Sequence, residues 1–268
     1  PADFVKLVLS AVRGGNSSFV LVNDKVAMEA LIRVGISATD ALDYVPIGCY
    51  EPAVWGMELG CTGNGGVNIA KTVELVLNGG CDFKTGKMRG LVPGKIESFD
   101  DFVCEIKRQI RYITEKCILN ITNIEKYYGY TNPDPLLSCQ YEDSVRRGID
   151  VYEGGAKYNN SSFYFYCIAS LIDSLCAVKK IVFDDKLHTL EELSKILRSN
   201  WQTNPKTRLI ALTSCEKYGN NTPLADSLTR EISDFCAELV NNVPNSRGGV
   251  FKASLFSIDY CFGLGKNT

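Results

Sequence analysis

Apolar side chains recur every three or four residues along several stretches of the chain, which is the spacing of a helix with one buried face. The longest stretch covers 102–128, and Ser98 with Asp101 supplies the capping pattern that opens such a helix. A second helix is predicted between Asn23, as its N-cap, and Gly35, as its stop. The remaining predicted helices cover 37–44, 67–77, 162–182, 189–199 and 224–243.

Strand patterns are shorter than the helical ones and lie far apart. Buried strands are predicted over 16–22 and 136–139, and the alternation over 250–257 predicts another. Residues 209–212 fit a strand or a helix, and the pattern does not decide between them. Two prolines bracket 45–52, which therefore is not a helix interior, and the glycine-rich stretch 60–66 has no predicted element. The fold class indicated is α/β, with strands separated by helical excursions.

Composition and charge narrow the classes of partner. Hydrophobic residues make up 45% of the 268 positions and charged residues 22%, as in an ordinary globular protein. The net charge is −2 and no basic block is present, so we expect a small-molecule substrate and neither nucleic acid nor a membrane as a partner. The 11 cysteines form no C-x-x-C pair and His188 is the one histidine, which indicates a reducing cytoplasm and no metal site.

Candidate chemistry lies in the segment Gly48-Cys49-Tyr50-Glu51-Pro52. In an extended chain side chains alternate, so Cys49 and Glu51 are expected on one side and Tyr50 on the other. Gly48 leaves room beside the sulfur, and Pro52 biases Glu51 away from the helical region. A sulfur and a carboxylate facing one cavity suit a reaction that moves a hydrogen atom and a proton on adjacent atoms. Taken by its residues alone, such a segment is more often structural than catalytic.

Residues 43–52 resemble the cysteine finger of the glycyl radical enzymes, the pyruvate formate-lyase-like superfamily, whose motif is G-C-x-E, often followed by proline. Further segments resemble motifs of the same family and follow the family's order along the chain. These segments are 23–24, 68–80, 154–159, 173–180 and 217–220. Each is weak alone, but the ordered set covers nearly the whole chain.

The resemblance implies a helix-rich α/β fold that is part of a ten-stranded barrel, with 1–268 as the central portion of the catalytic domain. It implies that a glycyl radical outside this segment, installed by a separate radical SAM activase, oxidises Cys49 to a thiyl. The thiyl would remove a hydrogen atom from a small hydroxylated substrate, and Glu51 would act as general base in a dehydratase or eliminase reaction. No cofactor would be bound directly, and the complete enzyme would be a cytoplasmic homodimer.

Some features depart from the complete family pattern. The chain starts at Pro1 without an initiator methionine, and the radical motif R-V-x-G-[YF] does not occur in it, so we expect an inactive fragment that is incomplete at both ends. Gly48 stands where pyruvate formate-lyase has a second cysteine, which disfavours acyl transfer to coenzyme A. After the finger, Thr62 and Asn64 are the candidate substrate-binding side chains, and the substrate itself is not specified.

Three alternatives stay open. A radical carbon–carbon lyase, of the formate acetyltransferase or arylacetate decarboxylase type, shares the G-C-x-E motif. A thiol hydrolase would use Cys49 as its nucleophile and would need a general base, for which His188 is the candidate histidine. A noncatalytic homologue would keep the fold without the radical chemistry.

Overall fold

The computed structural model describes residues 2–16, 20–48 and 50–256. Its longer helices are α1 Ala2–Arg13, α2 Asp24–Arg33, α3 Lys71–Leu77, α4 Phe99–Glu125, α7 Glu142–Arg147, α8 Ile168–Val178, α9 Leu190–Arg198, α10 Pro205–Thr213 and α11 Pro223–Val240. The shorter helical segments are η1 Asp40–Asp43, α5 Tyr128–Thr131, α6 Pro135–Ser138, η2 Val151–Glu153 and the π-helical η3 Lys179–Asp184. The strands are β1 Tyr44–Ile47, β2 Glu51–Val54, β3 Cys61–Asn68, β4 Ser161–Tyr166 and β5 Phe251–Phe256.

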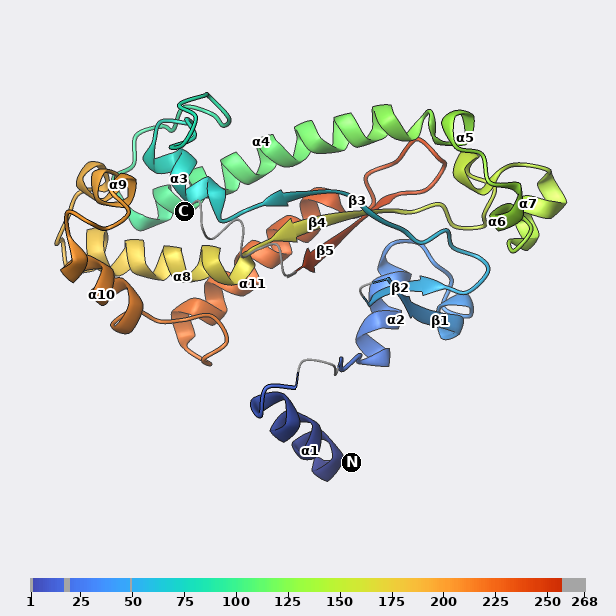
Figure 1. Ribbon diagram of the computed structural model, residues 1–268, viewed down its shortest axis with the longest axis horizontal. Coiled ribbons are helices and arrows are strands. Elements are labelled where there is room, and N and C mark those ends of the chain that lie inside the picture. Colours follow the sequence, from blue (N-terminus) through green and yellow to red (C-terminus); the bar gives the residue numbers. More distant parts are fainter. Residues whose placement is uncertain (1, 17–19, 49, 257–268) are drawn as a thin grey trace.

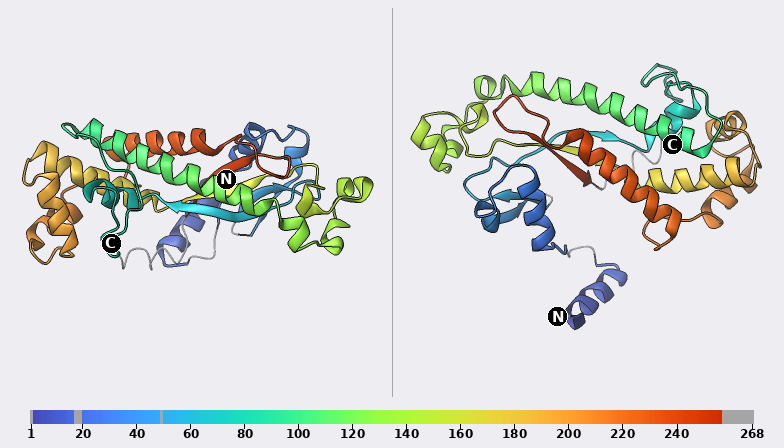
Figure 2. Two further views of the ribbon diagram at one scale, coloured as in Figure 1. Left: turned by 90° about the horizontal axis from the view of Figure 1, so that it is seen from above. Right: turned by 180° about the vertical axis from the view of Figure 1, so that it is seen from behind.

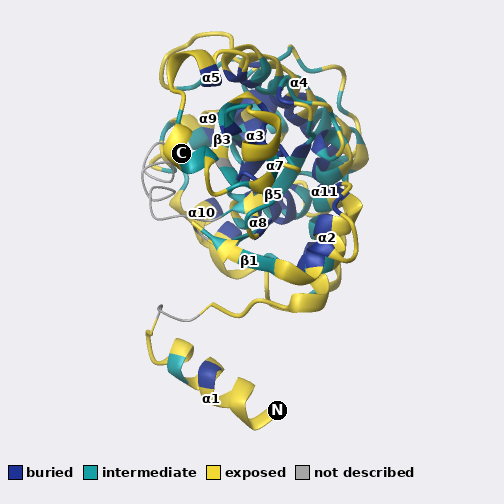
Figure 3. Cartoon of the chain, turned by 90° about the vertical axis from the view of Figure 1, so that its right-hand side faces the viewer, coloured by how far each residue is buried: buried dark blue, intermediate teal, exposed yellow. Residues whose placement is uncertain are grey.

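Strands β3, β4 and β5 form a parallel sheet in that order, although long helical segments separate them in the chain (Figure 1). Strands β1 and β2 pair antiparallel as a hairpin, with Tyr44 opposite Val54 and Ile47 opposite Glu51. In Figure 1, α4 runs along one side of the sheet, while α2 and the hairpin lie on the other. Helix α1 lies apart from both units, and most of its surface is exposed (Figures 2 and 3).

One face of the parallel sheet packs against α4, α8 and α11 and forms the main hydrophobic core. Phe163 and Phe165 of β4 and Phe251 of β5 are fully buried there, together with Ile110 of α4 and Leu171 of α8. Each buried side chain of this size contributes about 1.5–3 kcal/mol to folding. The core therefore fixes which face of each strand turns inward toward the helices.

The opposite face of the sheet carries polar side chains. Successive side chains of a strand point to opposite faces, so Ser162 and Tyr164 of β4 and Lys252 and Ser254 of β5 project away from the helices. This is the face beside which α2 and the hairpin lie. The buried aromatic core thus determines that polar groups from two adjacent strands gather opposite the hairpin.

Several predicted helices are confirmed together with their caps. The helix predicted over 102–128 is α4, where Asp101 N donates to Ser98 Oγ at 3.1 Å in a capping box. Asn23 caps α2 by accepting a hydrogen bond from Val26 N at 3.4 Å, as its position before the apolar pattern predicts. The undecided stretch 209–212 belongs to helix α10, and the strand predicted over 250–257 is β5.

The central strand β4 corrects the helix predicted over 162–182. Residues Ser161–Tyr166 are extended, and the helix begins only at Ile168. Aromatic side chains are favoured in strands, and an uninterrupted run of them suits a strand covered on both faces. Cys167, with φ of 68°, separates the strand from the helix and removes any continuity between them.

Strand β3 corrects two expectations, because the pattern predicts no strand over 60–66 and a helix from residue 67, whereas the helix α3 begins at Lys71. Glycine is a poor strand residue in general, but here its missing side chain is a packing requirement. A Cβ at Gly66 would lie 2.8 Å from the carbonyl oxygen of Tyr164, and a Cβ at Gly65 would collide with Ile121 of α4. The glycines let β3 approach both neighbours closely.

Two smaller strand predictions are wrong. Residues 136–139 fall in and after α6, where Asp134 accepts a hydrogen bond from Leu137 N at 2.9 Å and Pro135 occupies the first turn. A capping residue followed by proline is a helix start, and it outweighs the short apolar run. Of the run 16–22, residues 17–19 lie outside the described part of the chain, and residues 20–22 have no regular structure and exposed side chains.

The helix-rich α/β class is confirmed, whereas the ten-stranded barrel stays a prediction. Within the described part of the chain, the strands form one parallel sheet of three and one hairpin of two. Among the same residues, no helix is both long and apolar enough to cross a membrane.

The close approach at Gly66 generates a stability prediction. We expect Gly66→Ala to destabilise the protein by about 1–3 kcal/mol, because the added methyl group meets the backbone of Tyr164. Gly94→Ala is the matched control, since its Cβ would meet only the flexible end of Glu105, at 3.3 Å. Urea unfolding of both variants measures the difference, and equal free energies of unfolding would contradict the packing role of Gly66.

Candidate functional site

The hairpin β1–β2 turns at residues 48–50. Tyr50 N donates to Ile47 O at 2.9 Å, and Gly48 and Tyr50 have φ values of 52° and 83°. Cys49, the predicted thiyl-forming residue, lies outside the described residues. The extended conformation predicted across 49–51 is wrong at Tyr50, whose backbone is left-handed. A left-handed tyrosine costs on the order of 1–3 kcal/mol, and such strain persists only where the surrounding structure imposes it.

Glu51, the first residue of β2, contacts the parallel sheet through its carboxylate. Tyr164 Oη donates a hydrogen bond to Glu51 Oε1. The other carboxylate oxygen, Oε2, is buried and has no hydrogen-bond partner among the described residues. Buried polar atoms without a partner are rare, and each one calls for an explanation. One oxygen of Glu51 is therefore held by the sheet, and the other has no hydrogen-bond partner among the described side chains and backbone.

Lys252 of β5 connects the sheet to strand β2, at the residue next to Glu51. Its Nζ lies 2.8 Å from Glu58 Oε1 and 3.3 Å from the carbonyl oxygen of Pro52. Glu58 is buried, accepts from Asn160 Nδ2 at 3.1 Å, and pairs with the ammonium of Lys252. The charge of Glu58 is thereby compensated, and the backbone next to Glu51 is held by a residue of the sheet.

A pocket of about 730 Å³ lies between α2, the hairpin and the sheet. Glu51 lines it from the hairpin, and Ser162, Lys252 and Ser254 line it from the polar face of the sheet. The wall formed by α2 and the residues before it is largely apolar. A mostly apolar cavity of this size with a few convergent polar groups is typical of a small-molecule site.

Asp40 ties the base of the hairpin unit to the loop before β4. Its Oδ2 accepts hydrogen bonds from Lys157 Nζ and Tyr158 Oη, each at 2.6 Å, and Tyr158 Oη in turn accepts from Ser37 N at 3.1 Å. These bonds, with that of Lys157 the strongest, lower the pKa of Asp40 from 3.8 to about 2. Residues 154–159, which resemble a family motif, thus connect the finger to the sheet.

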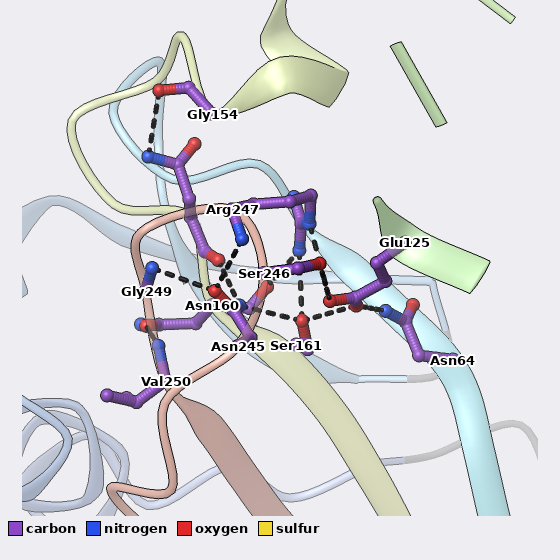
Figure 4. A network of polar contacts seen from close by, with 11 residues as sticks. Asn64, Glu125, Gly154, Asn160, Ser161, Asn245, Ser246, Arg247, Gly249 and Val250 are labelled. Carbon is purple, nitrogen blue, oxygen red and sulfur yellow. Dashed lines mark hydrogen bonds and ion pairs between the residues drawn. The ribbon is translucent and has the colours of Figure 1, made fainter. Parts of the chain in front are cut away.

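The candidate substrate-binding residue Asn64 has a protein partner. Its Nδ2 donates to Glu125 Oε1, within a buried polar network near the start of β4 (Figure 4). Glu125 also accepts from Ser161 Oγ at 2.5 Å, and its Oε2 lies 3.8 Å from Nε of the buried Arg247. Arg247 Nη2 donates to Asn160 O at 2.9 Å. Asn64 is therefore bound to this network, and the structure does not bring it beside Glu51 in the pocket.

The remaining site predictions concern Thr62, His188 and a possible metal site. Thr62 belongs to β3, and its side chain is outside what the structure describes. His188, the base of the hydrolase alternative, has its Nε2 2.7 Å from Thr207 Oγ1, at the entrance of α9. Within the described residues, no cluster of three or more His, Cys, Asp or Glu side chains is arranged to hold a metal ion.

Sequence reasoning missed Tyr164 and Lys252, two residues of the sheet that contact the finger. Tyr164 was hidden because the aromatic run is also compatible with an apolar helix. The alternation of Ser162 and Tyr164 with Phe163 and Phe165 is the pattern from which the polar face follows, once the segment is recognised as a strand. Lys252 stands in the predicted strand 250–257, but nothing in the sequence relates it to residue 52.

Comparison with known proteins assigns the chain to a family. Residues 1–265 match the family model described as Pyruvate formate lyase-like, and the chain belongs to this family. Over 274 residues it is 31% identical to the (2S)-3-sulfopropanediol dehydratase of Klebsiella oxytoca, covering 100% of this chain and 33% of that protein. The chain spans about a third of the length of the curated relatives it matches.

Solved structures agree with this assignment. The glycerol-bound B12-independent glycerol dehydratase of Clostridium butyricum matches with a TM-score of 0.78 and 33% identity, covering 86% of this chain and 29% of that one. A glycyl radical enzyme from Archaeoglobus fulgidus matches with a TM-score of 0.83 and 30% identity, covering 95% of this chain and 32% of that one. The family inferred from the finger and the ordered motifs is thereby confirmed.

The lowered pKa of Asp40 generates a prediction about pH. A carboxyl group with a depressed pKa in the folded state stabilises the protein above its unfolded pKa, and this contribution is lost as the pH falls toward the folded value. We expect the stability difference between wild type and Asp40→Asn to be largest above about pH 4 and to shrink as the pH approaches 2. Urea unfolding between pH 2 and pH 6 measures it, with the exposed Asp43→Asn as control. A difference that does not change with pH would contradict a stabilising role of the ionised Asp40 in its contacts with Lys157 and Tyr158.

The buried pair in Figure 4 generates a second stability prediction. Arg247→Met leaves the carboxylate of Glu125 buried without its cation, and we expect a loss of about 3–5 kcal/mol. The control is Lys195→Met, which breaks an exposed pair with Glu191 and should change the stability far less. Chemical denaturation compares the two variants. Equal effects would mean that the pair with Glu125 has no special weight.

Proposed function

We propose that the complete enzyme containing this chain is a glycyl radical lyase that eliminates water, or a comparable leaving group, from a small hydroxylated substrate. The observation that carries the proposal is the state of the Glu51 carboxylate. One oxygen accepts from Tyr164, the other is buried with no hydrogen-bond partner among the described residues, and Glu51 lines the pocket. A general base has to be within hydrogen-bond reach of the proton it removes, and a carboxylate that lines the pocket suits that role for a substrate hydroxyl.

The proposed reaction divides the work between Cys49 and Glu51. The glycyl radical, from outside these residues, supplies the unpaired electron. Cys49, as a thiyl, takes a hydrogen atom from the substrate carbon that bears the hydroxyl, and an S–H bond forms. Glu51 accepts the hydroxyl proton, and the neighbouring carbon releases its leaving group, which takes that proton to form water. Cys49 then returns the hydrogen atom to the product radical, so the reaction is redox-neutral and both residues are restored.

The substrate pocket and the partners follow from the same proposal. A small molecule with adjacent polar groups fits a cavity lined by Glu51, Ser162, Lys252 and Ser254 against an apolar wall. Thr62 and Asn64 on β3 stay candidate substrate contacts, with the bond from Asn64 to Glu125 as a competing use of its amide. A separate radical SAM activase would install the radical, and the complete enzyme would act as a homodimer.

Substitutions in the complete enzyme test the two proposed roles. After anaerobic activation, we expect Cys49→Ser to abolish turnover of small diols, and Glu51→Gln to lower kcat by roughly 10²–10⁴-fold. Both variants should keep the glycyl radical signal in electron paramagnetic resonance, because neither residue is the radical store. Cys104→Ser and Glu115→Gln, at exposed positions of α4, are the matched controls.

Two results would contradict the proposal. Full activity of Glu51→Gln would remove the general base while leaving the radical assignment of Cys49 intact. Full activity of Cys49→Ser would remove the thiyl mechanism itself. A stable radical signal in each variant is needed to read these outcomes as chemistry.

A further inference from the structure

Tyr164 is held rigidly on the polar face of the sheet. Tyr164 is only 4% exposed. Its ring stacks on that of Phe256 of β5, with the ring centroids 4.7 Å apart and the ring planes inclined by 22°. The ring of Tyr166 lies against it on the same strand, at 6.0 Å. A buried tyrosine packed by two further aromatic rings has little freedom to swing its hydroxyl group. The position of that hydroxyl is therefore set by the sheet.

Glycines of β3 let that strand lie close to Tyr164. A Cβ at Gly63 would stand 3.7 Å from Cε2 of Tyr164, and a Cβ at Gly66 would stand 3.0 Å from the Cβ of Tyr164. A side chain at Gly66 would also meet the ring of Tyr166, so the strand or its neighbour would have to shift. Glycine at this position thus keeps β3 and β4 close together at Tyr164.

The backbone beside Glu51 is fixed independently by β5. Lys252 Nζ lies 3.3 Å from the carbonyl oxygen of Pro52, and Glu58 holds the same ammonium at 2.8 Å. With the backbone fixed at residue 52, the remaining freedom of Glu51 lies in its own side-chain torsions. Those torsions are restrained by the hydrogen bond from Tyr164 to Oε1, while Oε2 is buried and has no partner among the described residues.

We propose that Tyr164 is the positioning residue for the general base: its hydroxyl holds Oε1 of Glu51 so that Oε2 meets the substrate hydroxyl. This inference rests on the proposed function of Glu51. Tyr164 would not exchange a proton with the substrate. Its contribution would appear in the proton-transfer step, since a misplaced carboxylate still binds in the pocket but meets the hydroxyl less often.

A double-mutant cycle in the complete activated enzyme tests the inference. We expect Tyr164→Phe to lower kcat by roughly tenfold to a hundredfold, the value of one hydrogen bond to a charged group, with KM changed by less than about threefold. In a Glu51→Gln background the same substitution should cause little further loss, because the carboxylate that it orients is already gone. Tyr152→Phe removes a hydroxyl from a half-buried tyrosine elsewhere in the chain, which packs against Tyr128, and is the control.

The outcomes separate this inference from the proposed function. Unchanged kcat in Tyr164→Phe, with Glu51→Gln impaired, would overturn the positioning role and leave the general base standing. A loss in Tyr164→Phe that multiplies with that of Glu51→Gln would also overturn it, because the two residues would then act independently. Full activity of Glu51→Gln would remove the base and the positioning role together. Retained radical signal and an unaltered unfolding midpoint in Tyr164→Phe exclude loss of activation or of fold as the cause.

Discussion

Strand β4 has to satisfy two environments at once, and the rest of the site depends on this constraint. Phe163 and Phe165 are drawn into the core beneath α4, α8 and α11, since together they bury large aromatic surfaces there. Because successive side chains of a strand point to opposite faces of the sheet, Tyr164 then lies on the face away from this core. A one-residue slip of the strand would expose both phenylalanines and would withdraw the tyrosine from Glu51. Hydrophobic burial on one face thus sets the registration of polar groups on the other.

Polar contacts between the hairpin unit and the sheet hold the finger in place. The hairpin is short, and a two-stranded hairpin alone is only marginally stable. Asp40 joins the unit to Lys157 and Tyr158 on the loop before β4, and Lys252 joins it to β5. These partners flank the start of the sheet and the middle of its polar face. The left-handed backbone at Tyr50 lies between these contacts in the chain. Backbone strain of this kind persists only where the surrounding structure imposes it.

The sequence predicted helices better than strands, and the physical reason is locality. Caps such as Ser98 with Asp101 lie within a few residues of the helices they open, so both the start and the period of α4 can be read directly. Strand β3 cannot be read in this way, since the contacts that favour glycine at 65 and 66 come from Ile121, Tyr164 and Tyr166, which are distant in the chain. The aromatic run of β4 is ambiguous for a related reason: its periodicity is visible only when both faces are assigned.

The same distinction applies to the candidate site. Cys49 and Glu51 were accessible to sequence reasoning because they share one short motif, and the family that this motif indicates is confirmed by the match over 1–265. Their spatial relation was not accessible, because it depends on a turn at Tyr50 that alternation does not describe. The orientation of Glu51 depends on Tyr164, whose neighbours Phe256, Gly63 and Gly66 come from both adjacent strands. A reactive motif can therefore be local while the geometry that makes it useful belongs to the sheet, and the search for further functional residues is best directed to the polar faces of strands whose other faces are most strongly buried.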